Sequence, residues 1–198
     1  MAILEVLKYP DSRLREISKP VERFDAEIKK LAENLLETMY AENGIGLAAA
    51  QVGELKRMLV IDTSPRDTGG RYEKNEMTDL ENKIEQPLVI INPVIVKGDG
   101  KTTFNEGCLS VPSFYEEVER FQTIELKYQD VNGKPKTLHA DGLLAICIQH
   151  EIDHLEGTLF IDHLSFIKNT KIKNTIKKHG YPDKNAEETE DEAEKLKV

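Results

Sequence analysis

The apolar positions that follow Asp25 have a helical pattern. Asp25 belongs to a residue type that caps helices, and Gly44 to one that ends them. The apolar residues between them recur at spacings of three and four and are Ile28, Leu31, Leu35 and Met39. This spacing predicts an amphipathic helix that presents one face to a core.

A second helix is predicted between Asp141 and Gly157, which can cap and end it in the same way. Its first half holds the longest unbroken apolar run of the chain, residues 143–148. A helix that is this apolar is expected to be buried.

Two apolar runs, residues 57–62 and 88–96, have the pattern of buried strands. Pro93 marks a bulge or an edge in the second run, because proline cannot donate to a strand ladder. Between the runs, residues 64–87 are rich in charge and in turn formers, which predicts a loop longer than most connections.

Residues 123–128 alternate between apolar and polar, as a strand with one buried face does. Asn132 and Gly133 favour a hairpin turn to a partner strand at 136–140. Strands before and around a buried helix, without regular strand-helix alternation, indicate an α+β domain.

Composition limits the classes of protein that remain. The chain has 198 residues, and 27 Lys and Arg against 36 Asp and Glu give a formal net charge of -9. This balance disfavours a protein that coats nucleic acid with its whole surface. Its apolar runs are far shorter than the roughly 20 residues that cross a bilayer, so no membrane span is expected. Without a signal-peptide pattern, and with two cysteines, the chain is expected to be cytoplasmic with reduced thiols.

The C-terminal part of the chain is divided by charge. Residues 167–179 hold five Lys and no acid, while residues 180–198 hold seven acids and three Lys. The first segment is predicted to be a basic helix that packs by Ile167, Ile172 and Ile176. We therefore expect one folded domain over 1–166 and a basic helix with an acidic tail over 167–198.

The strongest chemical signal is the HExxH pattern of His150, Glu151 and His154. On a helix the two imidazoles share one face and can bind one metal ion, while the Glu151 carboxylate can approach a water beside that ion. Incidental surface histidines are the alternative. The apolar neighbours argue against it, because they place this face against a core, where unpartnered histidines would be costly.

A hydrolytic metal site usually takes three protein ligands. The metzincin pattern would place a histidine where this chain has Phe160, and residues 167–181 contain no acid that could act as in thermolysin. Asp162 and His163 remain candidates for the third ligand.

The two cysteines are the other candidates. Cys147 lies about 10 Å along the helix axis from His154, too far to share an ion with it, so it is interpreted as a packing thiol. Cys108 is the better thiolate, because a bound metal would keep its thiol ionised.

Three motifs together resemble the signatures of a known family. They are GIGLAAAQ at 44–51, EGCLS at 106–110 and QHEIDHLEG at 149–157, and in this order they resemble the motifs of peptide deformylases. The resemblance implies an α+β fold in which antiparallel or mixed sheets pack around the helix that carries HExxH. It also implies a hydrolase that removes the formyl group from N-formylmethionyl nascent peptides.

The resemblance further implies that Cys108, His150 and His154 bind the metal and that Glu151 is the general base and acid. Gln51 and the backbone N–H of Leu109 would then hold the oxyanion. Ferrous iron, Fe2+, is implied as the metal, with Zn2+ or Ni2+ as substitutes; the ligand types alone suit zinc equally.

Two sets of residues are expected to bind the substrate. Those expected along its backbone are Gly44, Ile45, Gly46, Glu106 and Gly107. Glycines there would let a peptide lie close in extended form. The apolar residues expected around the methionine side chain are Leu143, Ile146 and Cys147.

Two expectations concern other parts of the surface. Many family members carry Arg shortly after EGCLS, where this chain has Tyr115, so Arg120 is expected to supply the charge. In some deformylases a basic C-terminal helix docks on the ribosome, so residues 167–179 are expected to attract rRNA phosphate.

Two other functions fit parts of the sequence. A metallopeptidase of another HExxH class would cleave internal amides, but the downstream ligand expected of it is missing. A non-catalytic, ribosome-associated or metal-storage module would need neither Glu151 nor Gln51, and this chain has both.

Overall fold

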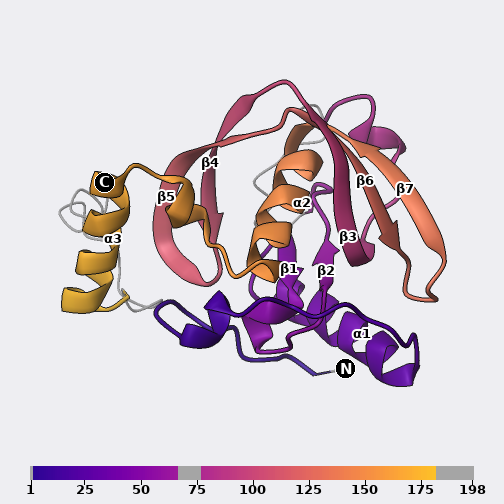
Figure 1. Cartoon of the computed structure of the whole chain (residues 1–198), viewed down its shortest axis with the longest axis horizontal. Coiled ribbons are helices and arrows are strands. Elements are labelled where there is room, and N and C mark those ends of the chain that lie inside the picture. The colour runs from indigo at the N-terminus through magenta and orange to yellow at the C-terminus, as the bar shows by residue number, and fades with distance from the viewer. Residues whose placement is uncertain (1, 67–76, 182–198) are drawn as a thin grey trace.

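The computed structural model describes residues 2–66 and 77–181, which form two antiparallel sheets and three α-helices (Figure 1). The strands are β1 (Gly46–Ala48), β2 (Met58–Ile61), β3 (Leu88–Asp99), β4 (Thr102–Cys108), β5 (Val111–Arg120), β6 (Thr123–Gln129) and β7 (Pro135–Ala140). The α-helices are α1 (Ala26–Ala41), α2 (Gly142–Leu155) and α3 (Phe166–His179). Short 3-10 turns cover Ser12–Arg15, Ala49–Val52, Glu81–Lys83 and Phe160–His163.

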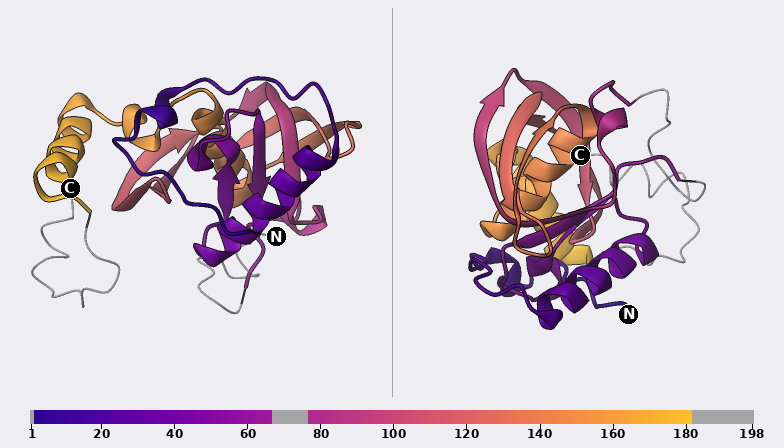
Figure 2. Two further views of the ribbon diagram at one scale, coloured as in Figure 1. Left: turned by 90° about the horizontal axis from the view of Figure 1, so that it is seen from below. Right: turned by 90° about the vertical axis from the view of Figure 1, so that its right-hand side faces the viewer.

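The larger sheet has the order β1-β2-β3-β6-β7, and β4 and β5 form a separate hairpin. The N-terminal strands of the larger sheet separate α1 from α2, as the end-on view in Figure 2 shows. Alternate residues of β2 serve the two sides: Met58 and Val60 pack in the core around α1, while Leu59 and Ile61 pack in the core around α2. Burial on both faces explains why β2 is an unbroken apolar run.

Most elements expected from the apolar pattern are present, and the class is α+β as predicted. The bulge expected at Pro93 is also present, because the pairing of β3 with β6 shifts register between Ile91 and Val94. Asn92 has a φ of 52° at this point, and its side chain bonds the backbone of Val21. The bulge therefore also ties the N-terminal segment to the sheet.

The predicted end of α1 was wrong, whereas α2 begins after Asp141 as predicted but is capped by a different side chain. Helix α1 ends at Ala41, and Asn43, with a φ of 56°, makes the left-handed turn expected of Gly44. Asp141 occupies the cap position of α2, but its side chain caps nothing. Instead, the buried carboxylate of Glu81 accepts a hydrogen bond from the Leu144 N–H at 2.8 Å. A distant residue thus stabilises the positive end of α2.

Helix α3 packs beside the β4–β5 hairpin (Figure 1). Ile172 and Ile176 are buried there with Phe114 and Phe160, as the sequence predicted. The expectation for Ile167 was wrong, because its side chain is 78% exposed. Parts of the loop predicted at 64–87 and of the acidic tail fall at residues 67–76 and 182–198, outside the described part of the chain. Within the described part, no helix has the length and apolar character needed to span a bilayer.

Candidate active site

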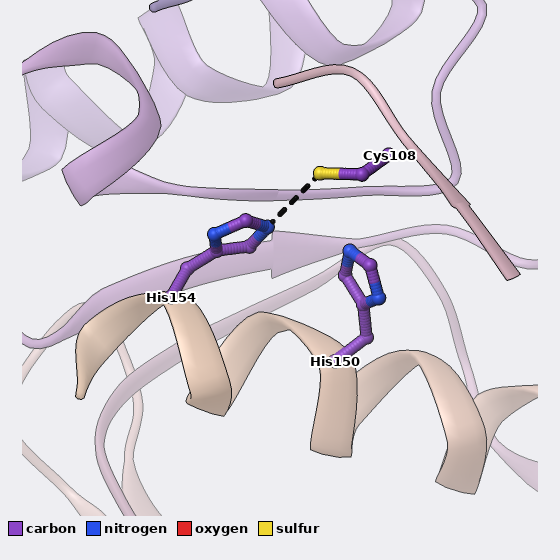
Figure 3. A group of neighbouring side chains, drawn as sticks. All are labelled: Cys108, His150 and His154. Carbon is purple, nitrogen blue, oxygen red and sulfur yellow. Dashed lines mark hydrogen bonds between the residues drawn. The ribbon is translucent and has the colours of Figure 1, made fainter. Parts of the chain in front are cut away.

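Helix α2 and the end of β4 bring three potential metal ligands together. His150 and His154 project from one face of α2 toward Cys108 (Figure 3). One ligand atom from each of the three residues lies within 4.8 Å of the others, and Cys108 Sγ is 3.2 Å from His154 Nε2. Within residues 2–66 and 77–181, this is the only such group of His, Cys, Asp and Glu.

The other candidate ligands lie elsewhere. Cys147 is buried beside β1, where its Sγ is 3.6 Å from the Ile45 carbonyl oxygen. Burial raises the pKa of this thiol well above its ordinary value, as expected for a packing residue. Asp162 pairs with Arg15, and His163 Nε2 is 2.7 Å from Asp153. Neither Asp162 nor His163 belongs to the ligand group.

A buried charge network orients His150. Its Nδ1 lies 2.8 Å from Glu106 Oε2, and Arg120 donates to both oxygens of Glu106 at 2.7 and 2.9 Å. Burial opposes ionisation of Glu106, yet hydrogen bonds from Arg120 and His150 lower its pKa to about 2. Glu106 is therefore an anion that can only accept, so His150 Nδ1 donates to it and Nε2 faces the ligand group.

Arg120 was expected to supply a charge near the substrate, but it is not among the residues that line the cavity. Its side chain is 5% exposed and is held by Glu106 and by Asp153, the latter at 2.6 Å. A charge removed from water needs such partners, so Arg120 belongs to the buried network that holds Glu106. Asp153 was not predicted to have a role, and its place beside His154 in the HExxH pattern was the available signal.

The carboxylate of Glu151 lies at the wall between α2 and β1. It is 3% exposed, and its Oε2 has no hydrogen-bond partner in the described part of the chain. Burial raises the pKa of Glu151 to about 7, which suits a group that exchanges protons near neutral pH. A Cβ on Gly46 would lie 2.5 Å from Glu151 Oε1 and 2.7 Å from Cys147 Sγ. Only glycine fits at this position.

Gln51 reaches the ligand group from the turn after β1. Its Oε1 accepts a hydrogen bond from the Ala48 N–H at 2.8 Å, which leaves the amide nitrogen pointing outward. That Nε2 lies 3.2 Å from Ser110 Oγ and 3.7 Å from Cys108 Sγ. The amide of Gln51 is thus a fixed donor beside the candidate ligands.

Strand β1 is an end strand of its sheet, and Gly46 faces the open edge. The Asp62 N–H donates to the Ile45 carbonyl at 2.9 Å, and Gly46 is opposite Ile61. In an antiparallel ladder this makes Gly46 and Ile61 a non-hydrogen-bonded pair. The N–H and C=O of Gly46 therefore point away from β2 and are placed to pair with an added strand.

A cavity of about 740 Å³ opens along this edge, within the size range of small-molecule sites. Its lining includes all the residues expected to bind substrate, namely Gly44, Ile45, Gly46, Glu106, Gly107, Leu143, Ile146 and Cys147. Gln51, Leu109, His150 and Glu151 line it as well, and Tyr115 lies against Gly107 at its mouth. The ligand group and the strand edge therefore open on the same space.

The donor set fits a metal ion. A thiol and two imidazoles converge, and His154 Nδ1 is a buried atom with no partner among the described residues. Burial and the neighbouring His150 lower the pKa of His154, which keeps it neutral, as a ligand must be. An α+β domain with such a trio, a carboxylate and an open cleft has the features of a metal-dependent hydrolase.

Comparison with known proteins narrows this class to one family. The family model described as Polypeptide deformylase matches residues 3–170. A peptide deformylase from Alkalilimnicola ehrlichii is 47% identical over 178 residues, covering 90% of this chain and 91% of its own length. One from Brucella suis is 46% identical, with 90% and 94% covered.

Solved structures agree with this. The peptide deformylase of Ehrlichia chaffeensis is 40% identical, covers 92% of this chain and 99% of its own, and has a TM-score of 0.79. A structure of that protein in complex with actinonin has a TM-score of 0.78 at 42% identity, with 91% and 100% covered. The chain belongs to the polypeptide deformylase family, whose members are metal-dependent hydrolases that remove N-formyl groups from nascent polypeptides.

Proposed function

We propose that this chain removes the formyl group from N-formylmethionyl nascent peptides with the residues of this one cleft. The observation that carries the assignment is the buried carboxylate of Glu151 beside the ligand trio and Gly46, one oxygen of which has no hydrogen-bond partner among the described residues. A metal-storage module would need neither this carboxylate nor an open strand edge.

Cys108, His150 and His154 would hold the metal, and Glu106 is a positioning residue that fixes His150. When bound, the ion supplies Lewis acidity at the formyl carbonyl. The buried carboxylate of Glu106 favours a cation there. Burial opposes protonation of His150, yet its hydrogen bonds with Cys108 and Glu106 raise its pKa well above the ordinary value.

Residues of the chain carry out substrate binding, proton transfer and stabilisation of the oxyanion. The edge of β1 at Gly46 holds the peptide backbone in extended form. Glu151 takes a proton from the water that attacks the formyl carbon and returns it to the departing amine, so formate and a free amino terminus are released. Gln51 Nε2 and the Leu109 N–H stabilise the negative charge on the former carbonyl oxygen.

The methionine side chain enters the part of the cavity lined by α2. Leu143, Ile146 and Cys147 line it there, and each is buried. An unbranched thioether suits such an apolar wall, because it can adapt its shape to it.

A formate-release assay on formyl-Met-Ala-Ser, run beside acetyl-Met-Ala-Ser and an internal-amide peptide, tests the activity. We expect release from the formyl peptide alone. Cleavage of the internal amide would instead favour a metallopeptidase, and no product from any of the peptides would favour a non-catalytic module.

The metal in this proposal is Fe2+, with Zn2+ or Ni2+ as substitutes. Ferrous iron beside a thiolate is open to oxidation, whereas zinc at the same site has no redox chemistry. We therefore expect iron-loaded protein to be faster without oxygen and to lose activity in air, while zinc-loaded protein stays constant. Equal rates and equal air stability would contradict the choice of iron.

We further propose that residues 1–166 form the catalytic part and that α3 docks the enzyme on the ribosome, which places it in the cytoplasm. Two of the five lysines of α3 are engaged internally: Lys168 pairs with Glu116 at 2.6 Å and Lys173 with Asp162 at 3.5 Å. Lys171 and Lys178 lie on an outer face with the exposed Phe166 and Ile167. This face can meet RNA phosphate without disturbing the domain.

The docking proposal is tested by co-sedimentation with ribosomes at rising salt. The double variant Lys171→Glu and Lys178→Glu is expected to lose salt-sensitive binding while its activity on a formyl peptide is retained. The matched control is Lys29→Glu with Lys30→Glu, two exposed lysines of α1. Equal sedimentation of both double variants would contradict docking through α3 and leave this helix with a structural role only.

A further inference from the structure

The open edge of β1 ends at Gly44, because the chain itself uses both backbone groups of that residue. The Gly44 N–H donates to the Met39 carbonyl at 2.8 Å. The Gly44 carbonyl accepts a hydrogen bond from the Arg66 guanidinium at 2.7 Å. A peptide laid along β1 thus finds backbone partners at Gly46 and none at Gly44.

Arg66 is held in this position by its neighbours. Its guanidinium lies over the ring of Tyr40, 5.0 Å from the centroid. The Tyr40 hydroxyl donates to Asp62 at 2.7 Å, and Asp62 N–H is the donor to Ile45. Helix α1, the end of β2 and the segment after β2 therefore converge on Gly44, and a guanidinium held in this way is a fixed cap rather than a passing surface contact.

The direction in which the substrate runs along β1 determines which of its residues lies opposite Gly44. Gly46 lies beside Glu151, and Gln51 of the following turn reaches Cys108, so β1 runs toward the candidate metal centre. A peptide whose formyl end is at that centre must run the opposite way, antiparallel to β1. With formyl-Met opposite Gly46, the third residue of the peptide comes opposite Gly44, because ladder positions on one edge repeat every two residues.

We infer that Arg66 is a specificity-determining residue that ends backbone recognition before the third residue of the substrate. This inference rests on the proposed deformylase function. The enzyme then recognises the formyl-Met end and is indifferent to the chain beyond it. Such indifference suits a substrate class whose members share only their first residue.

The test compares kcat/KM for formyl-Met-Ala amide and formyl-Met-Ala-Ser amide. Amidated peptides are used because a free carboxylate would be attracted to Arg66. For the unmodified protein, the ratio of the longer to the shorter peptide is expected to be close to one. Arg66→Met frees the Gly44 carbonyl for the third residue, and the ratio is expected to rise roughly three- to tenfold, as for one added hydrogen bond.

Two further variants keep the result interpretable. Arg66→Lys retains a donor for Gly44 and is expected to keep the original ratio. Arg23→Met, at a side chain that is 87% exposed and outside the cavity lining, controls for loss of an arginine. Thermal unfolding of each variant identifies any that fails to fold, and the ratio is independent of the amount of active protein.

The outcomes separate the two proposals. An unchanged ratio in Arg66→Met, or a fall in that ratio, would overturn the role of Arg66 while leaving deformylation intact. Absence of formate from both peptides in the unmodified, metal-loaded protein would instead overturn the proposed function itself.

Discussion

Glu106 lies two residues before Cys108 on β4 and accepts a hydrogen bond from His150 Nδ1 at 2.8 Å. The end of one strand therefore supplies one candidate ligand and orients a second, which stands on α2. Because Arg120 holds both oxygens of Glu106, the carboxylate cannot turn away from His150. The hairpin and the helix are thereby joined at the candidate metal centre.

Replacement of Glu106 tests this link. Glu106→Gln keeps an acceptor oxygen but loses the negative charge that fixes His150, so we expect metal affinity to fall about 10- to 100-fold. Competition with a chelator measures it. The control is Glu117→Gln, an exposed position on β5, and equal affinity in the two variants would remove Glu106 from the site.

Glu151→Gln separates proton transfer from metal binding. The amide preserves the shape of the side chain but cannot accept the proton of water, so turnover is expected to fall by about 10² to 10⁴. Metal content should remain at one ion per chain, measured by elemental analysis. Loss of the metal in this variant would count against the assigned role.

The two cysteines are expected to behave differently. Cys108→Ala should lower metal content, because it removes the thiolate from the ligand trio. Cys147→Ala should retain the metal, because its thiol packs against β1. Cys108→Asp should change which metal supports activity, since it offers a harder ligand. Metal loss in the Cys147 variant alone would reverse the ligand assignment.

Helix α3 is also expected to contribute to stability. Ile172 is fully buried with Phe114 and Phe160, so Ile172→Ala should lower the free energy of unfolding by about 2 to 5 kcal/mol. Ile167→Ala, on the same helix but exposed, should change it by less than about 0.5 kcal/mol. Denaturant unfolding of both variants measures the difference, and equal values would mean that α3 is not part of the core.

The elements predicted from apolar patterning, such as α1, β2 and β6, were those in which many apolar residues recur at the spacing of a helix or a strand. The hairpin of β4 and β5 was missed because its inward positions include Glu106, Glu116 and Arg120, so charges interrupt the expected alternation. Strand β1 was too short to have a pattern of its own.

The errors at Arg120 and at the cap of α2 have a common cause, which is partners distant in sequence. Arg120 was expected near the substrate because the carboxylates around it, Glu106 and Asp153, lie 14 and 33 residues away. The cap of α2 comes from Glu81, 63 residues before Leu144. By contrast, His150 and His154 could be placed together from local helical geometry alone.

The close approach of Gly46 to Glu151 also bears on inhibition and resistance. An inhibitor that pairs with the N–H and C=O of Gly46 binds backbone atoms, which no substitution except proline removes. A side chain at position 46 would collide with Glu151 and Cys147, so a mutation that blocks the inhibitor there would also displace the proposed general base. Few substitutions at position 46 could therefore confer resistance to a compound that binds there.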